Sequence, residues 1–284
     1  MTIKDLLKLN IFNRLEAEIL LAFLLSTSKE DIASHPEKEI TTKIANKFKR
    51  LVKQRKRNYP LAYILGYKDF YNLNLKVNKH VLVPRPETEI MIDFLLKYTR
   101  KNKHSNFNFL DIGTGSGAII IALAKNLEEN ISLNSNFLAT DISSRALKIA
   151  NYNLKKYNLT SKIKLQKSDL LKHVKLSYFN TSSKLIITAN LPYLTPQETK
   201  SEPSISREPK LALQAGKDGL KLYKRLFKMI HSKNLNNFIL ICEINPHQEN
   251  SIKSLQKNYL KDINIKTKIL KDLSGLTRFL IIEK

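Results

Sequence analysis

The stretch from Phe107 to Ile119 reads FNFLDIGTGSGAI, and the organisation of the chain follows from it. Its first residues, 107–110, interleave apolar residues with asparagine and predict a strand. Glycines 113, 115 and 117 then lead into the apolar run AIIIALA, which predicts a buried helix. Glycine lets the backbone come close to a ligand, and the first N–H groups of a helix lack partners within it. The pattern predicts a site for a nucleotide-like molecule, with a plain strand-to-helix turn as the alternative.

Two further strands supply acidic residues. Asn136–Asp141, NFLATD, is expected to be the second strand, and it ends 28 residues after the first glycine of the loop. In a doubly wound sheet the first two strands are neighbours, so Asp141 can accept hydrogen bonds from both hydroxyls of a ribose. The alternative is a residue that only caps the turn. A third strand at 163–165 precedes Asp169 and Leu170, which are expected beside an adenine ring.

The fourth strand carries the most informative motif. Lys184–Asn190, KLIITAN, is almost continuously apolar, which is typical of a strand buried on both faces. It runs into the tetrapeptide Asn190, Leu191, Pro192 and Tyr193. If the strand order reverses beside the first strand, this tetrapeptide lies next to the glycine loop. Asn190 and Tyr193 are then expected to meet the reactive end of the ligand.

The segment before the glycine loop is expected to form a helical domain and a linker. Over residues 1–67, apolar residues recur at three- and four-residue spacings, which predicts a small helical bundle. Residues 68–88 are expected to form a β-hairpin linker. Its strands are expected at 71–77 and 81–83, with a turn at residues 78–79.

Residues 83–89, VPRPETE, combine an arginine with two prolines that fix the backbone around it. They form either an interdomain elbow or part of the site. From there on, residues 89–284 are expected to form one domain of alternating strands and helices. Two strands near 263–270 and 278–282 close it as an antiparallel pair, so the fold class is α/β.

Composition limits the class of protein and the cellular compartment that the chain fits. The chain has 284 residues, enough for a large domain and a smaller one, and its 42% hydrophobic content is ordinary for a globular protein. Its one cysteine, Cys242, excludes an internal disulfide, and the six scattered histidines show no metal-ligand spacing. The longest apolar run, Ile19–Leu25, is too short to cross a bilayer, and the start lacks a signal-peptide pattern. We expect a cytoplasmic protein without a metal or a membrane contact.

A net charge of +24 is compatible with a nucleic-acid or acidic partner, but also with a compositional bias along the whole chain. Only Lys47–Arg57, KFKRLVKQRKR, is locally dense, with seven basic residues in eleven. The run is interpreted as a solvated helix face, with a partner-docking patch as the alternative.

The motifs together carry a resemblance to a known family. DIGTGSG, Asp141 after a strand, and NLPY resemble the class I S-adenosylmethionine-dependent methyltransferases, whose fourth motif is Asn/Asp/Ser-Pro-Pro-Tyr/Phe/Trp. The closing antiparallel pair is typical of their Rossmann-like sheet. Over nearly the whole chain, the order of further blocks is similar to the bacterial HemK-type release-factor glutamine methyltransferases; these blocks are PLAYILG, VPRPETE, EPKLAL, AGKDGL, EINPHQ and DLSGLTR.

The resemblance implies methylation of the side-chain amide nitrogen of the glutamine in the Gly-Gly-Gln loop of class I peptide chain release factors. S-adenosyl-L-methionine is the implied donor, and a monomer is expected. Asn190 and Tyr193 are the implied catalytic residues, with Leu191 and Pro192 also binding the substrate. The implied cofactor contacts are Gly113, Thr114, Gly115, Ser116, Gly117, Asp141, Asp169, Leu170 and Asn190.

An amide nitrogen is a poor nucleophile because its lone pair is delocalised. The Asn190 side-chain oxygen and the backbone carbonyl of residue 191 would accept from its two N–H groups, and Tyr193 would stack on the amide. Three positions depart from the family. Leu191 replaces a proline and loses its fixed φ, Asn245 replaces a glycine, and Leu170 stands where relatives often carry an aromatic residue.

Three rival functions are open to test. A nucleic-acid amino-methyltransferase acting on adenine or guanine faces the same planar amine, although no added base-recognition region is apparent. Direct nucleic-acid contact is therefore not favoured. A catalytically silent scaffold that uses Lys47–Arg57 would leave Asp141, Asn190 and Tyr193 unexplained. A nicotinamide dehydrogenase would leave the NLPY turn without a purpose.

Overall fold

The computed structural model describes residues 1–8, 13–129, 131, 134–261 and 264–284. The chain divides into two compact units, each treated by itself. One comprises Met1–Tyr67 with Glu202–Arg207, and the other comprises Lys68–Ser201 with Glu208–Lys284. Residue 263, where one of the closing strands was expected to begin, lies outside the described residues.

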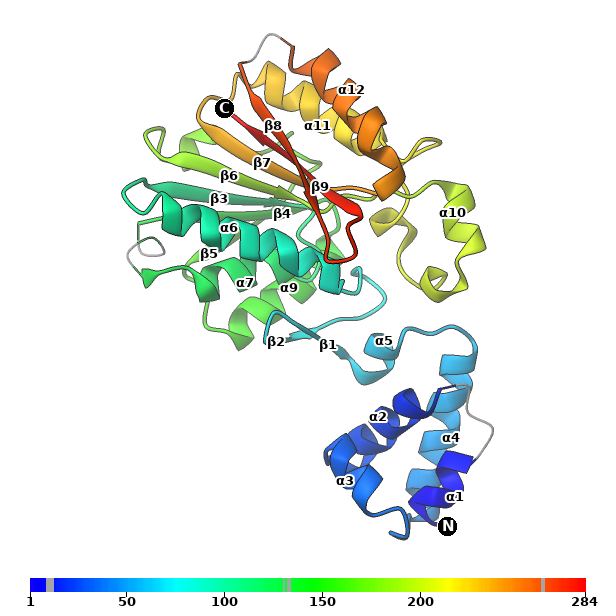
Figure 1. Ribbon diagram of the computed structural model, residues 1–284. Coiled ribbons are helices and arrows are strands. Elements are labelled where there is room, and N and C mark those ends of the chain that lie inside the picture. The colour runs from blue at the N-terminus through cyan, green and yellow to red at the C-terminus, as the bar shows by residue number, and fades with distance from the viewer. Residues whose placement is uncertain (9–12, 130, 132–133, 262–263) are drawn as a thin grey trace. The chain divides into compact units, whose positions relative to one another are not determined.

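The larger unit is built on a seven-stranded sheet in the order β5-β4-β3-β6-β7-β9-β8 (Figure 1). The five strands from β5 to β7 are parallel, and β9 runs antiparallel between β7 and β8. This confirms the expected α/β fold with its closing antiparallel pair. The strands are β3 (Phe107–Ile112), β4 (Asn136–Asp141), β5 (Ile163–Lys167), β6 (Lys184–Ala189), β7 (Phe238–Glu243), β8 (Lys266–Lys271) and β9 (Thr277–Glu283).

The strand order reverses at β3, and this reversal positions the site. Ile112, the last residue of β3, is in register with Thr140 of β4 on one side and with Ala189 of β6 on the other. The carboxyl ends of all three strands therefore meet at one edge, where open α/β sheets form their ligand crevice.

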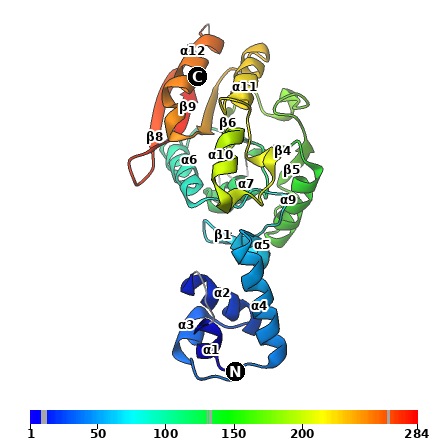
Figure 2. The same ribbon diagram turned by 90° about the vertical axis from the view of Figure 1, so that its right-hand side faces the viewer.

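Helices cover both faces of the sheet (Figures 1 and 2). One face packs against α6 (Glu89–Lys101), α7 (Ala118–Asn126) and α9 (Ser144–Lys156), and the other packs against α11 (Lys221–Ser232) and α12 (Glu249–Tyr259).

Alternation along β3 explains the two cores. Phe107 and Phe109 point to the first face, and Leu110 and Ile112 point to the second. The ring of Phe109 stacks on that of Phe137, with centroids 4.7 Å apart. Each strand of the sheet centre is thus apolar on both sides, as the continuous runs predicted.

The smaller unit has a core of its own, formed by helices whose apolar faces meet. It contains α1 (Ile3–Lys8), α2 (Arg14–Leu25), α3 (Lys29–Ser34), α4 (Thr42–Lys56) and α5 (Leu61–Leu65). Ile3, Leu6, Leu20 and Phe48 are at most 1% exposed. Each of the capping side chains Asn13, Ser28 and Thr41 accepts from a backbone N–H of the first turn, which defines where α2, α3 and α4 begin. Within the described residues, no helix is long and apolar enough to span a membrane.

The hairpin lies earlier than the alternation indicated. β1 (Tyr67–Phe70) and β2 (Leu73–Lys76) are joined by a two-residue turn at Tyr71 and Asn72, whose φ values are 49° and 58°. Two consecutive positive φ angles match the right-handed twist of a tight hairpin. A turn does begin at Asn78, whose carbonyl accepts from the Val81 N–H at 3.1 Å. The expected strand at 81–83 was wrong, because the pairing ends at Lys76 and no strand follows this turn before Arg85.

Several short elements complete the larger unit. The segment between β6 and Ala215 contains α10 (Pro196–Ser201) and the 3₁₀ turn η4 (Lys210–Ala212). The 3₁₀ turn η3 (Pro203–Ile205) lies between them in sequence and belongs to the smaller unit. The remaining 3₁₀ turns are η1 (Pro86–Thr88), η2 (Leu176–Tyr178) and η5 (Pro246–Gln248).

Candidate functional site

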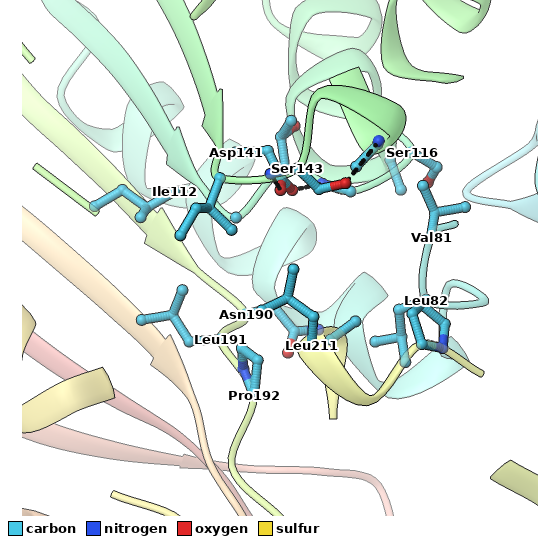
Figure 3. Close-up of a pocket in the computed structure, with 18 of the residues that line it drawn as sticks. Val81, Leu82, Ile112, Ser116, Asp141, Ser143, Asn190, Leu191, Pro192 and Leu211 are labelled. Carbon is cyan, nitrogen blue, oxygen red and sulfur yellow. Dashed lines mark hydrogen bonds between the residues drawn. The ribbon is translucent and has the colours of Figure 1, made fainter. Parts of the chain in front are cut away.

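A cavity of about 410 Å³ lies at the carboxyl ends of β3, β4, β5 and β6. This volume is within the range of small-molecule and cofactor sites. In Figure 3, Ser116, Asp141 and Ser143 lie on one side of the cavity, and Asn190, Leu191 and Pro192 lie on the other. Of the sequence-predicted site residues, the cavity is lined by Gly113, Thr114, Gly115, Ser116, Asp141, Asp169, Leu170, Asn190, Leu191 and Pro192; Gly117 and Tyr193 are not among the lining residues.

The glycine loop needs its first glycine for two reasons. Gly113 has φ +74°, a left-handed conformation that side chains disfavour. A Cβ at this position would also lie 3.1 Å from Cδ2 of Leu191. The loop is held to β4, because the N–H groups of Gly113 and Thr114 both donate to the carbonyl of Thr140, at 2.8 and 2.9 Å. Leu191 therefore packs directly on the loop. The sequence showed only that this leucine stands where the family has a proline.

Asp141 lies where the second strand meets the loop. Its Oδ2 accepts from the Gly115 N–H at 2.9 Å, and its Oδ1 accepts from the Ser143 N–H at 2.8 Å. Burial raises the pKa of Asp141, and these backbone hydrogen bonds act in the opposite direction. A carboxylate has about four lone-pair positions, so both oxygens retain acceptor capacity. The geometry fits an acceptor for two ribose hydroxyls.

Asp111 is a buried acid that the sequence analysis did not single out. Its Oδ1 accepts from the Thr188 hydroxyl at 2.7 Å, whereas its Oδ2 has no hydrogen-bond partner among the described residues. Burial raises the pKa of Asp111 to about 6, the Thr188 hydrogen bond and the nearby Thr114 hydroxyl lower it, and the Asp141 charge raises it further.

Asp169 and Leu170 line the cavity beyond β5, and their place beside an adenine ring stays a prediction. Leu170 has φ 51°, which is unusual for a leucine and turns the chain into the cavity wall. The sequence analysis missed Arg225 of α11, whose Nη2 lies 2.6 Å from Asp169 Oδ2. This ion pair occupies one oxygen of the carboxylate and leaves the other for a ligand.

Asn190 lines the cavity and belongs to a hydrogen-bonded cluster. Its Nδ2 donates to Glu243 Oε2 at 2.8 Å and to Thr88 Oγ1 at 3.2 Å. Thr88 Oγ1 in turn donates to Glu243 Oε2 at 2.7 Å. Thr88 lies in VPRPETE and Glu243 in EINPHQ, so both motifs were noticed, but no sequence pattern shows contacts between residues so far apart.

Tyr193, which was expected to face the ligand, is not among the residues that line the cavity. Its ring packs, partly buried, against the core of the second sheet face, and its hydroxyl donates to Glu243 Oε1 at 3.3 Å. Burial raises the pKa of Tyr193, and the Glu243 charge raises it further. The phenol is therefore a neutral donor. Its predicted stacking on a substrate amide stays a prediction.

Gln248 of the EINPHQ motif links the backbone after Asn190 to the AGKDGL motif. Gln248 Nε2 donates to the carbonyl of Tyr193 at 2.9 Å and to that of Asp218 at 3.2 Å. The side chain of Asn245 caps η5 and its backbone N–H donates to Gln248, which completes a capping box. Asparagine in place of the family's glycine thus acquires a local structural role.

The VPRPETE segment is part of the site. Pro84 and Thr88 line the cavity. Glu208, whose side chain is 1% exposed, accepts from the Val83 N–H at 2.9 Å and from Arg85 Nη2 at 2.5 Å. A buried carboxylate with two donors is well compensated. The first residue of EPKLAL therefore fastens that motif to VPRPETE.

The basic run Lys47–Arg57 occupies α4 and the residue after it, in the smaller unit. Most of its cationic side chains are exposed, and Arg55 pairs with Glu16 at 2.8 Å. The run contributes no residue to the cavity. Among the described residues, no group of histidine, cysteine, aspartate or glutamate side chains could hold a metal ion.

Two family descriptions match the chain. Residues 4–66 match the PrmC N-terminal domain, and residues 103–271 match a methyltransferase domain. The release factor glutamine methyltransferase of Thermodesulfovibrio yellowstonii is 31% identical over 99% of this chain and 96% of its own. That of Streptococcus pneumoniae is 35% identical over 87% of this chain and 83% of its own. The release factor glutamine methyltransferase of Coxiella burnetii is 32% identical over 94% of this chain and 91% of its own.

Solved structures with the same fold include two of a human protein. The hMettl16 catalytic domain in complex with the MAT2A 3′UTR hairpin 6 has a TM-score of 0.59 and 17% identity, covering 93% of this chain and 92% of its own. The N-terminal domain of human METTL16 in complex with SAH has a TM-score of 0.51 and 17% identity, covering 93% of each chain. At such identities the likeness concerns the fold.

Proposed function

Because this chain belongs to the release factor glutamine methyltransferases, we propose that it methylates the side-chain amide nitrogen of the glutamine in the Gly-Gly-Gln motif of class I peptide chain release factors. The protein is an enzyme, and its methyl donor is S-adenosyl-L-methionine. The observation that carries the proposal is that Asn190 shares one cavity with the glycine loop and Asp141.

Residues of the larger unit would hold the donor. The loop from Gly113 to Gly117 brings backbone close to the ligand, and Asp141 accepts from the ribose hydroxyls. Asp169 keeps one oxygen for the adenine amine, and Leu170 packs on the ring. When bound, the donor supplies a methyl group on a positively charged sulfur, which is a good leaving group.

The chain orients the nucleophile. The side-chain oxygen of Asn190 and the backbone carbonyl of Leu191 would accept the two N–H groups of the substrate amide. This holds the nitrogen in one direction and stabilises the positive charge that develops on it. Pro192 and Leu191 line the cavity on this side, where they exclude water.

Tyr193 would contribute packing and not proton transfer. Its raised pKa keeps the phenol protonated, and its hydroxyl is already engaged with Glu243. The proton of the methylated amide can leave after transfer, because the nitrogen has then become acidic. The chain therefore needs no general base in the cavity.

We also propose that the enzyme acts as a cytoplasmic monomer without direct contact to nucleic acid. The single cysteine, Cys242, is buried and free, and an oxidising compartment is not required. The relatives of this chain are named as release factor methyltransferases, and a substrate used in translation supports a cytoplasmic setting.

Incubation with methyl-labelled S-adenosylmethionine and purified release factor tests the function. We expect label on the glutamine, identified by mass spectrometry of the Gly-Gly-Gln peptide. Asn190→Ala should lower the transfer rate by about 10² or more, the usual effect of losing one oriented transition-state contact, while the cofactor still binds. The alternative, a nucleic-acid amino-methyltransferase, predicts label on tRNA or DNA and none on release factor.

Asp141 provides a test of the cofactor site. Asp141→Ala should weaken the binding of S-adenosylhomocysteine by on the order of 1 to 3 kcal/mol, because donors of the ligand and of the loop lose their acceptor. Titration calorimetry measures this, with Asp93→Ala on α6 as a carboxylate control outside the cavity. Unchanged affinity of the Asp141 variant would remove this residue from the site.

A further inference from the structure

Two buried side chains enclose the nitrogen end of the Asn190 amide. Glu243 Oε2 lies 2.8 Å and Thr88 Oγ1 lies 3.2 Å from Asn190 Nδ2. Glu243 and Thr88 are each 3% exposed, so water does not compete for these contacts. No hydrogen bond to Asn190 Oδ1 is formed within the described part of the chain, and Asn190 lines the cavity.

The orientation of the amide is decided by what these neighbours can accept. The two ends of an asparagine amide differ little in shape, so its direction follows from the hydrogen-bond network. The Glu243 carboxylate offers only acceptors. Thr88 has one hydroxyl proton and donates it to Glu243 Oε2 at 2.7 Å, which leaves lone pairs toward Asn190. Both neighbours require hydrogens from Asn190, and only its nitrogen end has them.

We infer that Glu243, acting with Thr88, is a positioning residue that keeps the Asn190 oxygen available to the nitrogen being methylated. If the amide turned over, its oxygen would face the Glu243 carboxylate oxygen and two acceptors would be opposed. The turned amide would also present N–H groups to a substrate amide that itself carries N–H groups. This inference rests on the proposed function of Asn190.

The surroundings of Glu243 suit this role. Three donors converge on its carboxylate, from Thr88 at 2.7 Å, Asn190 at 2.8 Å and Tyr193 at 3.3 Å. Burial raises the pKa of Glu243, while the hydrogen bonds from Thr88 and Tyr193 and the charge of Arg278 lower it. These donors partly compensate the burial of the carboxylate.

The Glu243→Gln variant tests the inference with little change in shape. Glutamine can turn its own NH₂ toward Asn190, so the asparagine oxygen is no longer excluded from that side. We expect the kcat of methyl transfer to fall by about 10- to 100-fold, part of the effect of losing an oriented contact. The KM for release factor and the affinity for S-adenosylhomocysteine should change less than about threefold, because Glu243 belongs neither to the residues proposed to bind the substrate nor to those proposed to bind the cofactor.

Glu283→Gln is the matched control. Glu283 also accepts from a tyrosine, Tyr98, at 2.5 Å, but it stands opposite Ile239 at the other end of β7. The kcat of Glu283→Gln should match that of the unaltered enzyme. An unchanged kcat in Glu243→Gln, or an equal loss in both variants, would overturn the inference.

A double-mutant cycle separates positioning from general structural support. If Glu243 acts through Asn190, then Glu243→Gln should slow the Asn190→Ala enzyme by less than about twofold, since the oriented group is already gone. A further loss as large as in the unaltered background would mean that Glu243 acts by another route.

A substrate-free readout keeps the inference distinct from the proposed function. The NMR signals of the Asn190 side-chain NH₂, assigned with Asn190→Ala, should be shifted and slow to exchange in the unaltered protein, and should lose this protection in Glu243→Gln. Thr88→Val should lose more protection than Thr88→Ser, which keeps a hydroxyl. If release factor is not methylated but these signals behave as stated, the substrate assignment fails and the positioning holds. If the NH₂ is unprotected throughout, the positioning itself is wrong.

Discussion

At the scale of single residues, the site brings two carboxyl groups close to the glycine loop, and they serve differently. Both oxygens of Asp141 accept from backbone N–H groups and keep capacity for a ligand. Asp111, one strand away, has only the Thr188 hydroxyl on one oxygen and nothing on the other among the described residues. Burial with so few donors destabilises the ionised form of this carboxyl group, which is why the pKa of Asp111 rises to about 6.

This raised pKa predicts a specific pH dependence. Below pH 4 the carboxyl group of Asp111 is protonated in both the folded and the unfolded chain. Between pH 4 and 6 the unfolded chain releases the proton and the folded chain keeps it, so the free energy of unfolding falls as pH rises. Relative to Asp111→Asn, the unaltered protein should lose about 2 kcal/mol over this window.

Urea unfolding of both proteins at pH 4, 5 and 7 measures the difference. Most other titrating groups are shared by the two proteins and cancel in the comparison, with the neighbouring Asp141 as the main coupled group. A difference that stays constant over this range would contradict the raised pKa.

At the scale of elements, the loop before α11 supports the turn formed by residues 190–193. Gly219 has φ +70°, and a Cβ there would clash with the carbonyl oxygen of Tyr193 and with Gln248 Nε2. The second glycine of AGKDGL is therefore needed because the backbone of the Asn190–Tyr193 turn passes directly over it. The motif is distant in sequence from NLPY, but its close approach fixes where that turn can lie.

Gly219→Ala should damage catalysis more than stability alone explains. Gly275, in the turn between β8 and β9, has a similar φ of +79° but open space where a Cβ would be. Both alanine variants pay the left-handed penalty of about 1 to 2 kcal/mol, and only Gly219→Ala displaces the turn. We expect methyl transfer to drop about tenfold or more in Gly219→Ala, since small misplacements of reacting groups are costly, and to be retained in Gly275→Ala.

Steady-state rates at saturating cofactor, together with urea unfolding of both variants, separate the two effects. Equal rates for the two alanine variants would show that the close approach at Gly219 does not control the turn.

At the scale of the whole molecule, the chain builds two units with separate cores. Phe48 is 1% exposed within the core of the smaller unit, and Phe109 is 1% exposed within the sheet core of the larger one. The residues that line the cavity belong to the larger unit. The smaller unit nonetheless includes 202–207, where Arg207 lies over the Tyr59 ring at 5.3 Å.

Phe48→Ala is expected to weaken one unit and spare the cofactor site. Truncating a buried phenylalanine costs about 3 to 5 kcal/mol. Hydrogen exchange should quicken in residues 1–67 and 202–207, while the affinity for S-adenosylhomocysteine stays unchanged. In the matched variant Phe109→Ala, which removes the ring stacked on Phe137, exchange should quicken around β3 and the affinity should fall. A loss of cofactor affinity in Phe48→Ala would refute the separation.

The sequence by itself determined the sheet and the cofactor side of the cavity. Apolar runs set β3, β4 and β6, and the glycines that follow β3 allow the left-handed backbone that Gly113 adopts, at φ +74°, with little strain. Since a reversal of strand order brings strand ends together, Asp141 and Asn190 could be placed at one edge before any coordinates were known.

Only the tertiary structure decided how the side chains proposed for catalysis are held. Thr88, Asn190 and Glu243 lie far apart in the sequence, and the contacts between them arise from strand order and from the path of residues 83–89 across the site. The same holds for Tyr193, whose ring packs in the core and whose hydroxyl turns to Glu243. Local periodicity reports which face a residue occupies, but hydrogen-bond direction depends on donors and acceptors that the folded chain brings from elsewhere.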